Sequence, residues 1–124
     1  MTHNKPVMSS PRFVSLIVIA LLLSGTMPAL SQLRSDLVDI PYPELSTLEP
    51  GVQEALRDAQ EQLERLAPDL GQVALTDFYG QLGMLYHAHQ LLAPAEVAYR
   101  NATMLTPDDS RWVHLRALAL EDEG

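Results

Sequence analysis

The segment from Tyr79 to Pro107 constrains the fold of this chain more than any other part of it. Its small, aliphatic and aromatic residues recur at three- and four-residue steps, which is the period of a helix face. Small residues on facing stripes allow two helices to approach closely, so we expect alanine methyl groups of a second helix to pack against Gly83 of the first. The segment therefore predicts an antiparallel pair of helices. The positions that carry this pattern are Tyr79, Leu82, Gly83, Tyr86, Ala95, Tyr99, Ala102 and Pro107.

An amphipathic helix is expected before this pair. Apolar residues recur at four- and three-residue steps between Val52 and Leu66. Ser46 and Glu49 have the spacing of a capping box, and Pro50 suits the first turn of a helix. This helix then spans about four to five turns.

The pair and a final helix complete the expected domain. The first helix of the pair opens near Thr76 or Asp77 and runs to about His89, and Pro107 prevents the second from continuing. An N-cap within the stretch 108–110 starts a fourth helix, which carries Trp112 on its apolar side. These elements, about four helices, predict an all-α fold.

The N-terminus has the three-part plan of a secretory signal peptide. Two cations and no acid precede an apolar run over residues 13–23, which a glycine and a proline then interrupt, and small residues suit cleavage after Ser31. Eleven helical residues rise only about 16 Å, less than the roughly 30 Å of a hydrocarbon core. We therefore expect residues 1–31 to direct export, to a periplasm or out of the cell. An uncleaved anchor to the inner membrane over residues 13–30 is the alternative.

Residues 32–46 are expected to form an extended arm between the signal segment and the helices. Pro41 and Pro43 flank Tyr42, and the stretch has no helical period. The remaining residues, 47–124, are then the helical domain.

The composition excludes several classes of function. After residue 31 the chain has six arginines, no lysine and sixteen acidic residues, a net charge of −10. Because so acidic a body repels phosphate backbones and anionic lipid, we expect no nucleic-acid partner, and membrane contact only through an uncleaved signal segment. The absence of cysteine excludes a disulfide, a c-type haem attachment and a thiol nucleophile. We expect no cofactor.

Motifs for catalysis or metal binding are missing from the sequence. His87 and His89 stand two residues apart and would point about 200° apart on a helix, so we expect no metal there. The patterns G-x-S-x-G and H-E-x-x-H do not occur. The glycosylation sequon that begins at Asn101 falls inside an expected helix and is interpreted as coincidental. We predict that the chain is not an enzyme.

The eight positions between Tyr79 and Pro107 resemble one tetratricopeptide (TPR) repeat with no insertion among them. The resemblance sets a complete repeat over residues 76–109 and a partial one, marked by Trp112, over residues 110–124. The lead-in from residue 40 to residue 66 also looks like that of exported bacterial TPR proteins. The resemblance implies TPR-type helical hairpins and a protein-protein interaction module, an adaptor or an assembly factor, without catalysis.

The resemblance also implies where a protein or peptide partner would bind. The family uses a concave face that the first helices of successive repeats line. Because the partial repeat lacks its second helix, its open C-terminal end is expected to support self-association. The alternative is that the chain is the truncated N-terminal stub of a longer TPR or enzyme-linked protein and has no independent function. By position, the concave face would contain Asp77, Gly80, Met84, His87, Ser110, Val113 and Ala117.

Overall fold

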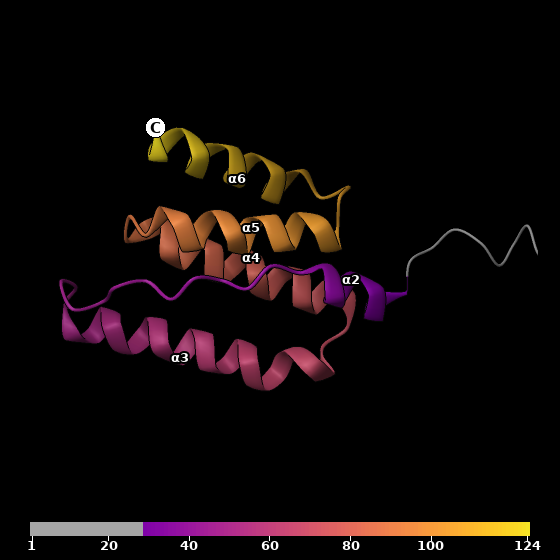
Figure 1. The fold of residues 1–124 in the computed structure, drawn as a ribbon, viewed down its shortest axis with the longest axis horizontal. Helices are drawn as coiled ribbons and strands as arrows, with labels where there is room; N and C mark the ends of the chain where they lie inside the picture. Colours follow the sequence, from indigo (N-terminus) through magenta and orange to yellow (C-terminus); the bar gives the residue numbers. More distant parts are fainter. Residues whose placement is uncertain (1–28) are drawn as a thin grey trace, which may run out of the picture.

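A computed structural model describes residues 29–124, and within these residues the protein is all-α, with five α-helices, one 3₁₀ turn and no strand (Figure 1). The predicted all-α class is confirmed, with one helix more than the four expected. The predicted signal segment lies outside the described residues except for residues 29–31. The elements are α2 (Leu30–Asp36), α3 (Pro50–Leu66), the 3₁₀ turn η1 (Ala67–Asp69), α4 (Gln72–Ala88), α5 (Leu92–Leu105) and α6 (Ser110–Glu123).

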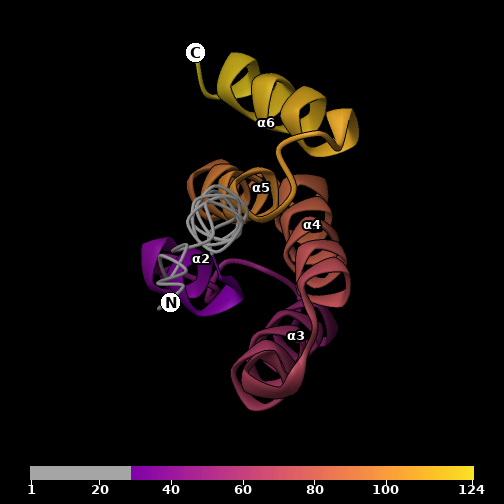
Figure 2. The ribbon, with the colours of Figure 1, turned by 90° about the vertical axis from the view of Figure 1, so that its right-hand side faces the viewer.

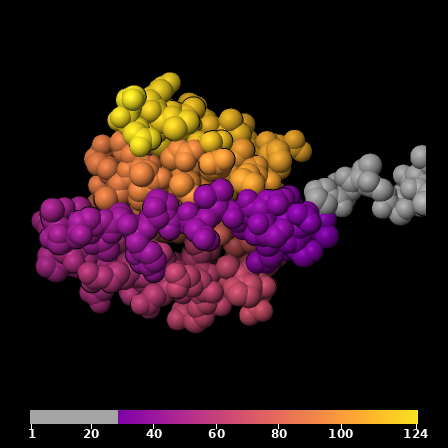
Figure 3. All heavy atoms as spheres, viewed as in Figure 1, coloured from indigo at the N-terminus to yellow at the C-terminus, as the bar shows by residue number. Residues whose placement is uncertain are grey.

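Helices α4 and α5 form the centre of the molecule. Helix α6 lies along one side of this pair, and α3 lies against α4 on the opposite side. Helix α2 lies beside α5 (Figure 2). Residues 37–45, which follow α2, form an extended segment that crosses the molecule in front of α4 and separates α3 from α5 on that face (Figures 1 and 3). Segment 37–45 therefore lies between α3 on one side and α5 on the other.

The close approach of α4 and α5 depends on Gly83. A Cβ atom placed on Gly83 would lie 2.6 Å from two ring carbons of Tyr99, whose side chain is fully buried. Tyr99, which was expected at the flank of this contact, therefore lies nearest to Gly83 in place of an alanine methyl group. The alanines Ala95, Ala98 and Ala102 are nonetheless fully buried on α5.

A pair of glycine substitutions tests this packing. Gly83→Ala is expected to lower the free energy of unfolding by about 1 to 2 kcal/mol, because the overlap with Tyr99 outweighs the gain in helix propensity. Gly51→Ala, in the first turn of α3, is the control: nothing lies within 4 Å of its added Cβ, so stability should rise by up to about 1 kcal/mol. Urea unfolding followed by circular dichroism measures both, and a rise in the stability of both variants would contradict the assigned contact.

Helix α6 docks on the central pair through Trp112. The indole ring lies over Gly80 of α4, where any Cβ would overlap it, and the side chain is 3% exposed. The Asp109 side chain accepts a hydrogen bond from the backbone N–H of Arg111, which caps the start of α6 as predicted for the stretch 108–110. Gly80 is therefore covered by α6, and the implied place for it on an open concave face is wrong.

The predicted start of α4, at Thr76 or Asp77, is four or five residues too late. The helix begins at Gln72 after an N-cap at Gly71 that has no side-chain hydrogen bond. The Gln72 amide donates to the carbonyl of Leu105, and the hydroxyls of Thr76 and Thr106 lie 2.7 Å apart. These contacts with the end of α5 hold the first turn of α4 in place of a capping residue.

Two predictions for the N-terminal part also need correction. Helix α2 occupies the beginning of the stretch that was expected to be extended, since it continues to Asp36. The capping box from Ser46 does not form: Glu49 is the N-cap of α3, without a side-chain cap, and the Ser46 N–H donates to Glu44 instead.

Candidate functional site

The predicted partner residues on α4 lie along the stripe that faces α6. Asp77 and Arg111 form an ion pair of 3.3 Å near the start of both helices. His87 Nε2 lies 2.8 Å from a carboxylate oxygen of Asp122 near the end of both. Met84, between them in sequence, is 42% exposed. Polar contacts thus tie α4 to α6 at both ends and leave Met84 accessible.

The Asp77 contact belongs to a small charged cluster at the start of α6. The Arg111 guanidinium donates to both carboxylate oxygens of Asp109, and its hydrogen bonding lowers the pKa of that carboxyl. Arg111 also stacks on Trp112, with its guanidinium carbon 4.7 Å from the ring centre. Arg111 therefore fixes the N-terminal turn of α6 against α4.

The predicted partner residues on α6 do not lie beside those on α4. Arg111 and Asp122, which contact α4, share one stripe of α6, whereas Val113 is about 200° round the helix from Arg111. This other side of α6 adjoins α5, because Arg116 donates to Glu96 at 2.7 Å. Ser110, Val113 and Ala117 are exposed there, together with Leu120. Apart from the buried Gly80, the predicted partner residues thus divide into two surfaces.

A second candidate site lies between α3, α4 and α5, where segment 37–45 is bound. The side chain of Asn101 in α5 is fully buried and makes two hydrogen bonds to the backbone of Val38. Its Oδ1 accepts from the Val38 N–H at 2.9 Å, and its Nδ2 donates to the Val38 carbonyl at 2.7 Å. Asn101 thus pairs with the segment as a neighbouring β-strand would.

Arg34 fixes the other end of this connection. Its guanidinium donates to the backbone carbonyls of Ala67 and Leu70, which follow the end of α3. A cation at the C-terminal end of a helix is favoured by the free carbonyls and the helix dipole. Arg34 therefore holds this part of the chain against the end of α3, and Asn101 holds it against α5.

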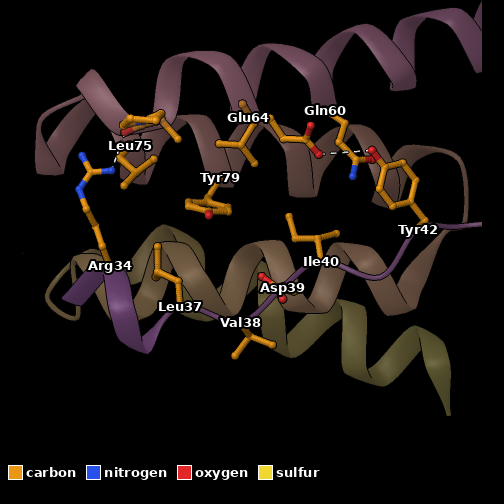
Figure 4. A pocket seen from close by; sticks show the side chains of 13 residues that line it. Arg34, Leu37, Val38, Asp39, Ile40, Tyr42, Gln60, Glu64, Leu75 and Tyr79 are labelled. Carbon is orange, nitrogen blue, oxygen red and sulfur yellow. Dashed lines mark hydrogen bonds between the residues drawn. The ribbon is translucent and has the colours of Figure 1, made fainter. Parts of the chain in front are cut away.

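A cavity of about 540 Å³ remains beneath segment 37–45. Figure 4 shows Tyr79 of α4 in its middle, Arg34 at one end, and Gln60, Glu64 and Tyr42 at the other. The Tyr42 hydroxyl lies 3.3 Å from a Glu64 carboxylate oxygen. The walls are mostly apolar. Leu37, Ile40, Leu63, Ala67, Pro68 and Leu75 supply them.

Burial raises the pKa of the Tyr79 phenol, and the negative charge of Asp39 adds to this effect. The sequence pattern predicts for Tyr79 only a role in the packing of the helix pair. In the structure it is only half-buried and forms the floor of the cavity. Tyr79 therefore belongs both to the core and to this second site.

Among residues 29–124, no group of three metal-ligating side chains comes together, at His87 and His89 or elsewhere. Within the same residues, no helix has the length and apolar character needed to span a membrane. The candidate binding surfaces of residues 29–124 are the α4–α6 face, the exposed side of α6 with Val113 and Ala117, and the cavity under segment 37–45.

Asn101 was missed as a site residue, although the sequence held a signal for it. It stands among Ala98, Ala102 and Leu105 on the apolar stripe of α5. Because a buried amide must find hydrogen-bond partners, an asparagine at such a position indicates a polar group opposite it. Its partner could not be identified without the fold, because Val38 is 63 residues away along the chain.

Comparisons of this chain with models of protein families, with curated proteins and with solved structures give no match.

Proposed function

We propose that this chain is an exported protein-protein interaction module of TPR type, an adaptor or assembly factor without catalysis. One observation carries the proposal: α4 and α5 close on each other at Gly83, and α6 lies back on α4 through Trp112 over Gly80. This order of packing, a helical hairpin followed by the first helix of a next unit, is what a TPR repeat and a half would give. The exported location rests on the sequence of residues 1–31 alone.

The partner-binding surface in this proposal is the α4–α6 face around Met84. Methionine adapts its shape to a partner, and its 42% exposure gives a partner an apolar contact between the Asp77–Arg111 ion pair and the His87–Asp122 hydrogen bond. The acidic body of the chain favours a partner with a basic surface at the rim of this contact.

Met84→Glu is expected to abolish capture of the partner, because it places a charge at the centre of the apolar contact. The measurement is recovery of proteins from an envelope extract of the native host on the immobilised full-length chain, with and without the substitution. His87 is unsuited to this test, because a glutamate there would face Asp122 and release α6.

Val113→Glu is the matched control for this experiment. Val113 is 46% exposed, much as Met84 is, but it lies on the side of α6 away from α4. The same partner should be recovered by the Val113 variant and by the unchanged protein. Equal loss of that partner in both variants, or equal retention in both, would show that the α4–α6 face is not the binding surface.

A further inference from the structure

The groove between α3, α4 and α5 already holds an extended peptide, namely segment 37–45 of the chain itself. We infer that this groove is a binding site for an extended peptide segment of a partner protein, and that segment 37–45 occupies it in cis as a replaceable ligand. The site is separate from the α4–α6 face of the proposed function, so either can fail without the other.

The first support is that the central contact, made by Asn101, is with the backbone of the segment and not with a side chain. Asn101 donates to the carbonyl of Val38 and accepts from its N–H, at 2.7 and 2.9 Å. Any extended residue other than proline offers this pair of groups, since each carries one backbone donor and one acceptor. The same recognition of main chain underlies the addition of a peptide to a sheet edge.

A second support is that the cis segment fills its groove incompletely. The pocket beneath it has a volume of about 540 Å³ and is partly open to solvent. Leu37 and Ile40 line this space while remaining partly exposed. A segment with larger apolar side chains at these two positions would bury more surface against Leu63, Leu75 and Tyr79 than the chain's own segment does.

The contacts also define the chemistry of the partner segment. Arg34 binds the carbonyls of Ala67 and Leu70 and stands three residues before Leu37. Beyond the Asn101 contact, Ile40 lines the cavity, and the open end carries the carboxylate of Glu64. The groove thus fits a segment with an arginine, an apolar pair three residues later, and a further apolar residue two positions beyond that pair.

The test uses the full-length chain with the cis segment weakened. Arg34→Ala with Val38→Pro removes three of the hydrogen bonds that hold it, two from Arg34 and one from the Val38 N–H. The probe is a labelled synthetic peptide of residues 32–45, which carries Arg34, Leu37, Val38 and Ile40, and binding is followed by fluorescence anisotropy. We expect the double variant to bind this peptide at least tenfold more tightly than the unchanged chain.

Two further variants identify the site of binding. Adding Asn101→Leu to the double variant should weaken peptide binding at least tenfold. If that protein loses helix content by circular dichroism, Asn101→Asp replaces it, because aspartate keeps the acceptor for the peptide N–H and loses the donor to its carbonyl. Asp58→Ala in the otherwise unchanged chain is the control, since Asp58 is an exposed carboxylate on α3 that does not line the cavity. It should bind the peptide as weakly as the unchanged chain.

Three results would overturn the inference. Equal affinity of the double variant and the unchanged chain would show that the groove is not freed by loss of the cis contacts. Equal binding of a peptide with the same residues in scrambled order would show that the contact is nonspecific. Full binding after the Asn101 substitution would place the peptide elsewhere on the molecule.

Discussion

Replacing Trp112 with alanine is expected to lower the free energy of unfolding by about 3 to 5 kcal/mol. The side chain is 3% exposed and its ring lies over Gly80, which has no side chain to fill the space left behind. The substitution also removes the surface on which Arg111 stacks. A domain of this size has about 5 to 15 kcal/mol of stability in total, so the loss is a large fraction of it. Urea unfolding followed by circular dichroism measures the change.

Val113→Ala provides the control for this measurement. Val113 is the next residue of α6 and is 46% exposed, so its truncation should change stability by no more than about 0.5 kcal/mol. A loss below about 1 kcal/mol for Trp112→Ala would mean that α6 is not docked on the central pair in solution. In that case the α4–α6 face would also have to be abandoned as a binding surface.

Raising the pH above 10 is expected to destabilise the protein through Tyr86 and Tyr99. Burial raises the pKa of both phenols from 10.0 to about 12. Because the folded pKa lies above the unfolded one, the unfolded chain loses these protons first, and stability that is present below pH 10 is lost as the pH rises towards 12. The loss is about 1.4 kcal/mol per pH unit for each tyrosine. Urea unfolding at about pH 9 and about pH 11, with tyrosinate absorbance, measures it.

Tyr86→Phe should remove about half of this pH dependence, since one of the two buried phenols is gone. The same variant leaves Gln60 without its 3.0 Å hydrogen bond, which lowers stability equally at both pH values. Tyr42→Phe is the control, because Tyr42 is 69% exposed, and it should keep nearly the full pH dependence. An unchanged pH dependence in the Tyr86 variant would contradict the role assigned to this phenol.

The central helices were predictable because the residues that pack them together recur at short, regular intervals in the sequence. The stripe that contains Gly83 and the alanines of α5 has the period of a helix face, and Pro107 ends the segment at a fixed point. The N-cap before α6 and the burial of Trp112 also follow from residues close together in sequence. Local patterns of this kind require no knowledge of the rest of the chain.

The N-terminal part was predicted less well because contacts distant in sequence decide it. Helix α2 has no side-chain cap and no buried residue, and it is held through Arg34, which reaches carbonyls more than thirty residues away. The first turn of α4 depends in the same way on Leu105 and Thr106. Rules of helix propensity and capping predict neither contact, because tertiary contacts override these local preferences.

The candidate sites divide along the same line. Asp77, Met84 and His87 could be placed on one stripe of α4 from their spacing, and they do share it. Which side of α6 would face them could not be derived, because the turn between α5 and α6 sets the rotation of that helix. Asn101 and the cavity under segment 37–45 required the tertiary structure altogether, since Val38 meets Asn101 only in the folded chain.

The buried amide of Asn101 also has a consequence for how the protein can be produced. In a host whose secretory pathway recognises Asn101-Ala-Thr103, an oligosaccharide attached during synthesis would sit on the nitrogen that donates to the Val38 carbonyl. A bulky sugar cannot be accommodated at a fully buried position. Sugar attachment and docking of segment 37–45 thus exclude each other, so a bacterial expression host, or Thr103→Ala in a eukaryotic one, preserves the native fold.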